Sequence, residues 1–223
     1  MKNFLFFFLC VLTVSCSQKS IYLDPSVLID KLDFKYGQYV NVDGKILARE
    51  WSDARVFQIP MYNDSRAKVY YKTNGGLLYF AFEIYEKVIP DTTNSEIRIW
   101  ISADHKNKDK YPSETEYEFR LAPFEKGKEN TESLGNGKSY FNSGKKRMPN
   151  QKDWLGKPNL TYQHKWTAEF VIPKEKIKDG TKIADKLKIA FYIGNGEQEM
   201  AFPSYSPKKW LPTTVETLAV NPK

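Results

Sequence analysis

The chain has 223 residues, of which 41% are hydrophobic and 27% charged, and its formal net charge is +7. This composition excludes collagen-like, low-complexity and disordered chains. A mean hydropathy of -0.58 with a single long apolar run also excludes a polytopic membrane protein. The positive charge is modest and much of it falls within residues 126–152, which is typical of a solvated lysine-rich surface. We therefore expect no nucleic-acid partner.

The first 16 residues have the pattern of an export signal. Lys2 precedes an apolar segment at 4–14 that is too short to span a bilayer. The segment ends in Ser15-Cys16, and a small residue directly before a cysteine resembles a bacterial lipobox. That resemblance implies cleavage before the cysteine and lipidation of its sulfur. We therefore expect a lipoprotein anchored in the outer membrane of the cell envelope through Cys16.

The cysteine count agrees with this interpretation. Cys10 would be removed with a signal peptide at 1–15, which leaves Cys16 as the one cysteine of the mature chain and no possible disulfide. Residues 16–35 are expected to form the lipidated cysteine, a tether and an N-terminal segment. Residues 36–223 are expected to form the folded domain.

Alternation of apolar and polar residues predicts strands through the rest of the chain. The predicted strands are 68–72, 77–86, 95–102, 114–121, 166–172 and 187–193. Short helices are expected only at 24–32 and 173–177, and no segment repeats at a fixed period. Many short strands with one apolar face predict an all-β fold, a single antiparallel β-sandwich with a long excursion between strands at 127–158.

Five groups of residues, in order, are similar to the family 9 carbohydrate-binding modules, within the wider DOMON-like group. They are Val42-Asp43-Gly44-Lys45 with Glu50-Trp51, 67–69 with 76–83, 96–102 with 117–120, 166–173, and the tail 204–218. The family fold is a β-sandwich, which agrees with the periodicity. The resemblance implies non-catalytic binding of a glycan, in support of polysaccharide catabolism.

The resemblance also implies a site in which two tryptophans sandwich a terminal sugar and charged side chains bind its hydroxyls. Trp210 matches one of these tryptophans in position, and Arg120 matches a ligand-binding arginine. The second tryptophan would lie within 90–94, where this chain has no aromatic residue, and Arg98 stands where a glutamate is expected.

Strand pairing adds further residues to this candidate site. If 95–102 pairs with 114–121, Arg98 lies near Arg120 and Trp100 near Glu118. Facing like charges need neutralisation, either by a bound anion or acidic sugar or internally by nearby glutamates at 96, 116 and 118. The predicted ligand-binding residues are Trp210, Arg120, Trp100, Arg98, Glu118 and Trp154. Trp154, late in the long excursion, either folds over the site or pins the loop, whereas Trp51 and Trp166 are expected in the core.

Metal and cofactor signals are weak. Asp104, Asn107 and Asp109 could offer oxygen ligands to a structural Ca²⁺, but the intervening lysines oppose a cation and a plain polar loop is the alternative. Other DOMON-like domains hold haem through methionine with histidine or lysine, so a redox domain is an alternative function. The candidate residues for it are Met61, Met148, Met200, His105 and His164.

The sequence contains no nucleophile-elbow motif and no glycine-rich phosphate loop followed by a helix. An enzyme is therefore not expected, although a glycosidase-type pair of carboxylates would not show in sequence spacing. A scaffold role in the envelope with a degenerate sugar site is a further alternative.

Overall fold

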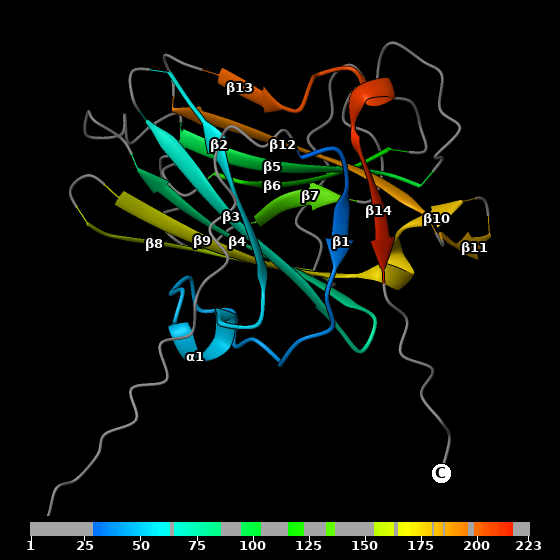
Figure 1. Cartoon of the computed structure of the whole chain (residues 1–223), viewed down its shortest axis with the longest axis horizontal. Coiled ribbons are helices and arrows are strands. Elements are labelled where there is room, and N and C mark those ends of the chain that lie inside the picture. Colours follow the sequence, from blue (N-terminus) through cyan, green and yellow to red (C-terminus); the bar gives the residue numbers. More distant parts are fainter. Residues whose placement is uncertain are drawn as a thin grey trace, which may run out of the picture.

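Two β-sheets stacked face to face form the body of the molecule (Figure 1). The computed structural model describes residues 29–62, 65–85, 95–103, 116–122, 133–136, 154–162, 165–179, 181–184, 186–195 and 199–215. The predicted signal peptide and the lipidation site at Cys16 lie outside these residues. The predicted β-sandwich is confirmed.

The first sheet has seven strands. In spatial order they are β1 (Leu32–Phe34), β14 (Leu211–Val215), β12 (Leu187–Asn195), β5 (Ser95–Ser102), β6 (Glu116–Leu121) and β7 (Ser133–Asn136), with β13 (Glu199–Phe202) also paired to β12. β5 pairs with β12 along one of its edges. The other edge of β12 is shared by β14 and β13, which pair with successive parts of it. The pairing of β1 with β14 is parallel, and it is an exception to the predicted antiparallel pattern.

The second sheet has five strands, and all its pairings are antiparallel. Their order is β2 (Arg55–Pro60), β3 (Arg66–Asn74), β4 (Leu77–Tyr85), β9 (Lys165–Pro173) and β8 (Leu155–Tyr162). The small elements are the one-turn helix α1 (Ala48–Trp51), the 3-10 turns η1 (Lys174–Lys176) and η2 (Pro207–Lys209), and the hairpin β10 (Lys178–Asp179) with β11 (Lys182–Ile183). None of the described helices is long and apolar enough to cross a membrane.

Three local expectations need correction. The short helix expected at 24–32 is wrong in its described part, because residues 29–31 are irregular and Leu32 begins β1. β1 also brings the start of the sandwich ahead of residue 36. The excursion expected at 127–158 contains β7 and the first half of β8, whose glycine, lysine and proline residues gave little strand signal in the sequence.

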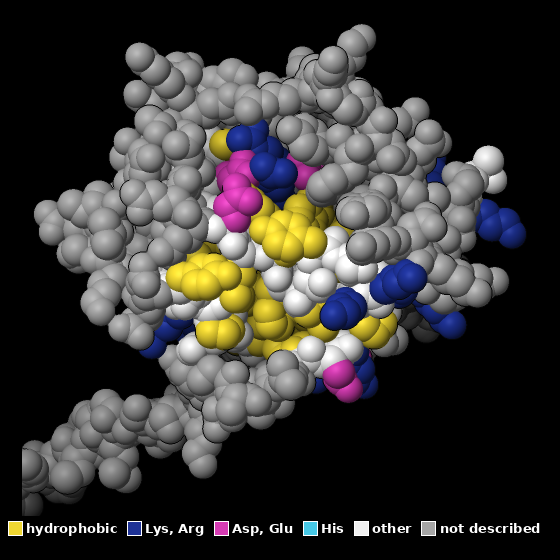
Figure 2. All heavy atoms as spheres, turned by 90° about the horizontal axis from the view of Figure 1, so that it is seen from above, with side chains coloured by type: hydrophobic (Ala, Val, Ile, Leu, Met, Phe, Trp, Pro, Cys, Tyr) yellow, Lys and Arg dark blue, Asp and Glu magenta, His cyan; other side chains and the backbone are white. Residues whose placement is uncertain are grey.

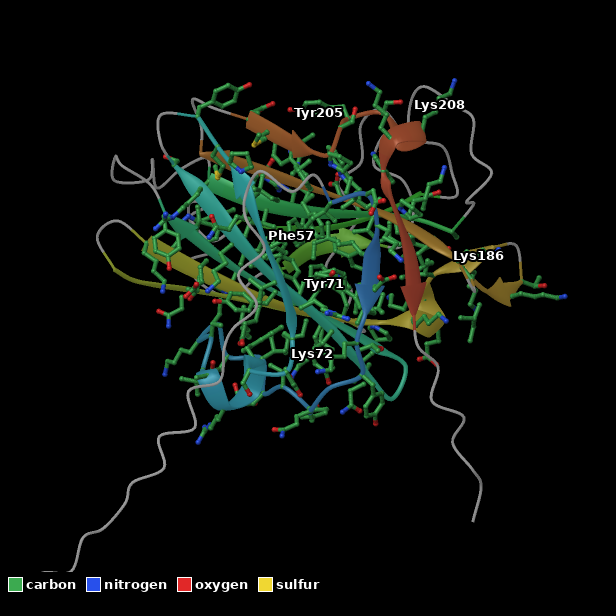
Figure 3. The ribbon with its side chains drawn as sticks, in the orientation of Figure 1. Phe57, Tyr71, Lys72, Lys186, Tyr205 and Lys208 are labelled. Carbon is green, nitrogen blue, oxygen red and sulfur yellow. The ribbon has the colours of Figure 1, made fainter. Side chains whose placement is uncertain are left out.

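The main core lies between the sheets, on the face that alternation predicts. Leu78, Phe80, Phe82 and Ile84 of β4 all point into it. Phe57 and Tyr71, labelled in Figure 3, pack there with their rings 5.9 Å apart. Trp166 is buried in the same core, as expected. Tight packing of large apolar side chains on both inner faces is what holds two such sheets together.

The outer face of the five-stranded sheet carries a smaller core beneath α1. Trp51 is buried there with Tyr79 and Ala81, the opposite face of β4, so the expectation that Trp51 is structural is confirmed. Lys72 of β3 is fully buried on the same side, where its Nζ donates to Asp53 Oδ1 at 2.7 Å and to the backbone oxygen of Glu50. The ion pair and the backbone bond offset the cost of burying this cation.

Glu169 of β9 joins two of the five groups that carry the sequence resemblance, the first and its own at 166–173. Its carboxylate accepts hydrogen bonds from Trp51 Nε1 at 2.7 Å and from the backbone N–H groups of Asp43 and Gly44 at 2.9 and 2.8 Å. Gly44 has φ +85°, and an added Cβ would lie 2.7 Å from the Pro158 oxygen, so this turn requires glycine. These motifs therefore build the scaffold.

Candidate functional site

The pairing of β5 with β6 gathers the predicted charged residues on the outer face of the seven-stranded sheet. Arg98 lies opposite Arg120 and Trp100 opposite Glu118, as predicted. β12 then places Ala190 beside Trp100 and Tyr192 beside Arg98. Figure 2 looks onto this face, where acidic and basic side chains gather beside a patch of hydrophobic ones.

The two facing arginines are neutralised by glutamates of the same face. Glu96 accepts from Arg98 Nε at 2.7 Å through one carboxylate oxygen and from Arg120 through the other. Arg98 also lies 3.7 Å from Glu118 Oε2. Of the alternatives left open by the sequence, internal neutralisation is therefore what the structure contains.

The network is partly shielded from solvent, which shifts its ionisation. Burial raises the pKa of Glu118, and Arg98 together with the 2.8 Å hydrogen bond from Trp100 Nε1 opposes that rise without cancelling it. Burial alone would lower the pKa of Arg98, but Glu118 and Glu96 hold it above its usual value. The Arg98 guanidinium also lies over the Tyr192 ring, 4.6 Å from its centroid.

An aromatic cluster adjoins the charged network. The ring of Trp100 stacks on that of Trp210 with centroids 5.9 Å apart and planes inclined by 14°. Trp100 also meets Tyr192 at 5.7 Å and Tyr205 at 5.9 Å. Both tryptophans are 2% exposed, so the rings of this pair are almost fully covered. We call the residues Glu96, Arg98, Trp100, Glu118, Arg120, Tyr192, Tyr205 and Trp210 the outer-face cluster.

Trp210 reaches this face from the turn before β14. It follows η2, which is closed by a hydrogen bond from the Lys209 N–H to the Ser206 oxygen at 2.9 Å. The Trp210 indole N–H donates to the Ser204 oxygen at 3.1 Å, which ties the ring to the segment that carries Tyr205. The position of Trp210 is thus fixed by this short loop as well as by Trp100.

Tyr192 and Tyr205 are the aromatic residues of the cluster that the sequence interpretation missed, and Tyr205 is the exposed one. Its side chain is 52% exposed, and Figure 3 shows it on the side of β13 away from the five-stranded sheet. Burial, together with Glu199 and Tyr62, raises the pKa of its phenol. The sequence did carry a signal, since Tyr205 belongs to the tail motif at 204–218.

Trp154 does not lie on this face. It is 4% exposed in the main core, where its ring stacks on Phe170 with planes inclined by 4° and meets Phe119 edge-on at 5.4 Å. The prediction that Trp154 folds over the site is therefore wrong. Its alternative, that Trp154 pins this part of the chain to the body of the protein, agrees with the structure. A large apolar ring gains more from the space between two sheets than from an exposed position.

The weaker metal and haem candidates mostly lie outside the described residues. This holds for Asp104, Asn107 and Asp109 and for His105, His164 and Met148. Met61 and Met200, which are described, are partly buried against the main core. Among the described residues, no group of three or more His, Cys, Asp or Glu is placed to hold a metal ion.

Comparison with solved structures gives the class of fold. A family 9 carbohydrate-binding module from Caldicellulosiruptor kristjanssonii, solved with glucose, aligns with a TM-score of 0.60 and 12% identity over 86% of this chain and 98% of that one. Solved with cellotriose, a module of this family from the same organism gives 0.59 and 12% over 86% and 96%. The chain therefore has the β-sandwich fold of family 9 carbohydrate-binding modules.

A protein from Bacteroides uniformis whose name indicates carbohydrate binding also shares this fold. It aligns with a TM-score of 0.53 and 11% identity, over 84% of this chain and 99% of that one. No family model matches the sequence, and no curated protein matches it either.

Proposed function

We propose that the protein is a non-catalytic glycan-binding module and that it binds sugar at the outer-face cluster. The observation that carries this proposal is the adjacency of a fixed Arg98–Glu96–Arg120 network and an aromatic cluster on one sheet face. Support comes from the fold, which is shared with modules solved in complex with cellotriose and glucose.

The two parts of the cluster match the two surfaces of a sugar ring. Pyranose rings present C–H faces that pack on aromatic rings, and their hydroxyls need directed donors and acceptors. Guanidinium groups only donate hydrogen bonds and carboxylates only accept them. The neighbouring Arg and Glu side chains of the network therefore offer both donors and acceptors to sugar hydroxyls. Glu96 and Glu118 hold Arg98 in place, so little side-chain entropy is lost when a ligand binds.

The charge balance of the network favours a neutral sugar over an acidic one. Its two arginines are matched by Glu96 and Glu118. A ligand carboxylate would have to displace a glutamate that already holds an arginine, and it would also approach the remaining glutamate. Hydroxyl groups can share the same donors and acceptors at no such cost.

The setting of this binding is part of the proposal. The lipobox-like Ser15-Cys16 supports an envelope lipoprotein, anchored through the lipid on Cys16. A glycan-binding module held at the outer membrane would keep polysaccharide close to the cell, and a role in polysaccharide catabolism follows from that placement.

A glycan array followed by calorimetry tests the proposal. The purified protein should bind neutral oligosaccharides, with cellotriose and glucose as the first probes and oligogalacturonides as the acidic comparison. Arg120→Lys keeps the charge but loses the planar fork, so affinity should fall roughly tenfold. Arg49→Lys is the control, because Arg49 is 79% exposed on α1 at the other sheet. Absence of binding to every glycan by the folded protein would refute the proposal.

Trp210→Ala provides a second variant. We expect its affinity to fall roughly tenfold or more, about 1.4 kcal/mol per decade, because loss of the ring removes the stacking partner of Trp100 and the hydrogen bond to the Ser204 oxygen. Trp210 is buried, so the comparison uses protein that circular dichroism shows to be folded. Unchanged affinity in that folded variant would place the site elsewhere on the molecule.

A further inference from the structure

We infer that Tyr205 is the stacking residue of this site, and that Trp100 and Trp210 hold it in position rather than enclose the sugar themselves. This inference rests on the proposed function and assigns its specificity-determining aromatic residue. It starts from the geometry of the two tryptophans.

The tryptophan pair leaves no room for a sugar between its rings. Carbon atoms in contact lie about 3.5–4.0 Å apart, so a pyranose packed between two rings needs centroids at least about 7 Å apart. Trp100 and Trp210 are 5.9 Å apart with nearly parallel planes, which is the spacing of two rings in offset contact. Each ring therefore uses a face on the other, and with both residues 2% exposed, neither offers a second face to solvent.

Tyr205 is the aromatic residue of the cluster with an available face. It is 52% exposed, whereas Tyr192 is 4% exposed beneath Arg98. The inner side of the Tyr205 ring contacts Trp100 at 5.9 Å and Tyr192 edge-on at 6.3 Å. Stacking on a sugar requires an aromatic ring that other residues hold in place on one side and that solvent reaches on the other.

The loop that carries Tyr205 is fixed from within the cluster. Trp210 Nε1 donates to the oxygen of Ser204, and the Ser206 N–H donates to Ser204 Oγ at 3.2 Å. These two bonds flank Tyr205 on both sides in the sequence. Trp210 thus acts on the ligand through the position of Tyr205, which makes it a positioning residue.

Polar partners for a stacked sugar lie beside this ring. Arg98 lies over the Tyr192 ring, 4.6 Å from its centroid, and Tyr192 in turn meets the Tyr205 ring edge-on at 6.3 Å, so the charged network adjoins Tyr205. The phenol itself is not needed for stacking, because the ring faces carry that contact. This predicts that the ring of Tyr205 matters more than its hydroxyl.

Binding of purified full-length protein to an array of neutral oligosaccharides that includes cellotriose tests the inference, with calorimetry on the bound probes. Tyr205→Ala should weaken binding at least tenfold, whereas Tyr205→Phe should stay within about threefold of the wild type. Tyr39→Ala is the matched control, because Tyr39 is 69% exposed and packs against Tyr79 on the other sheet.

A double variant separates positioning from direct contact. If Trp210 acts through Tyr205, Trp210→Ala combined with Tyr205→Ala should bind about as weakly as either single variant. Losses that multiply would show that Trp210 contacts the sugar independently and would overturn its assignment as a positioning residue.

The outcomes for the inference and for the proposed function are distinguishable. Wild-type binding that survives Tyr205→Ala overturns the inference and leaves the proposed function in place. Wild-type protein that binds no oligosaccharide of the array overturns both. Loss of binding in Tyr205→Phe equal to that in Tyr205→Ala would assign the contact to the hydroxyl and also overturn the stacking role.

Discussion

Single residues in this protein owe their state to what the fold places around them. Glu96 holds two arginines on the outer face of one sheet, and Glu169 holds a backbone turn on the outer face of the other. Lys72, an ordinary surface residue by type, is fully buried because α1 covers that part of β3. In each case a charged group is tolerated because specific partners replace water.

Glu169 should make stability depend on pH. Burial raises its pKa from 4.5 to about 7, against the hydrogen bonds from Trp51, Asp43 and Gly44. The folded protein therefore holds this proton more tightly than the unfolded chain does. Its contribution is complete below about pH 4.5 and is lost as the pH rises through about 7.

The variant Glu169→Gln, which does not titrate, isolates this contribution. The stability advantage of the wild type over Glu169→Gln should shrink by about 1–3 kcal/mol between pH 4.5 and pH 7. Urea denaturation of both proteins across that range measures the difference. An advantage that stays constant or grows with pH would contradict the assigned pKa.

At the scale of elements, contacts between segments that are far apart in the sequence hold turns and short helices against the outer faces of the two sheets. The turn at Asp43–Gly44 is fixed from β9 through Glu169, and Thr167 Oγ1 donates to the Gly44 oxygen at 2.6 Å. α1 contributes mainly Trp51, whose ring caps the outer face of β4. On the other sheet, the short turn η2 places Trp210 against the outer face in a similar way.

Gly44→Ala should destabilise the protein more than Gly75→Ala. Both glycines have positive φ, +85° and +55°, so alanine costs about 1–2 kcal/mol at either position. At Gly44 the new Cβ would also lie 2.7 Å from the Pro158 oxygen, whereas nothing lies within 4 Å at Gly75. We expect an additional loss of about 2 kcal/mol for Gly44→Ala, measured by chemical denaturation. Equal losses of stability in the two variants would contradict the close approach of Gly44 to Pro158 of β8.

Trp51→Ala should lower stability and leave the glycan affinity of the folded protein unchanged. Truncation removes a buried aromatic ring, at a cost of about 3–5 kcal/mol, and also the hydrogen bond to Glu169. Thermal unfolding measures the first effect and calorimetry the second. Trp51→Phe, which keeps most of the ring volume, should lose less. A Trp51→Ala protein with native stability would contradict the structural role of α1.

As a whole molecule, the chain is one sandwich with a distinct outer face on each sheet. Part of the outer face of the five-stranded sheet is covered by α1 and its flanking turns (Figure 1). The opposite face presents the outer-face cluster, so the proposed ligand and α1 lie on opposite sides of the body. Such a separation allows binding residues to be changed with limited effect on the scaffold.

The whole protein is predicted to be membrane-attached through its N-terminus. Cys16→Ala removes the sulfur that would carry the lipid, so the protein should move from the membrane fraction to the soluble fraction. Cell fractionation and intact mass of the mature protein provide the measurement. Ser17→Ala is the matched control, since it leaves the cysteine in place. Unchanged membrane retention and mass in Cys16→Ala would contradict lipidation.

The sequence by itself determined the strands with strong alternation and how two of them pair. Apolar residues at every second position assigned the inner face of β4, and pairing of the two neighbouring strands β5 and β6 through a polar connection placed Arg98 opposite Arg120. Both follow from alternation, because side-chain direction alternates along a strand and the buried face of each strand restricts the register in which they pair.

Only the tertiary structure decided which of these residues are accessible. The burial of Trp154 between the sheets, the contact of Trp100 with Trp210, and the exposure of Tyr205 depend on segments that are distant in the chain. The parallel pairing of β1 with β14 is of the same kind, since it joins the two ends of the described chain. Residue type and spacing do not encode such long-range contacts, because they arise only when both sheets and their connecting turns pack together.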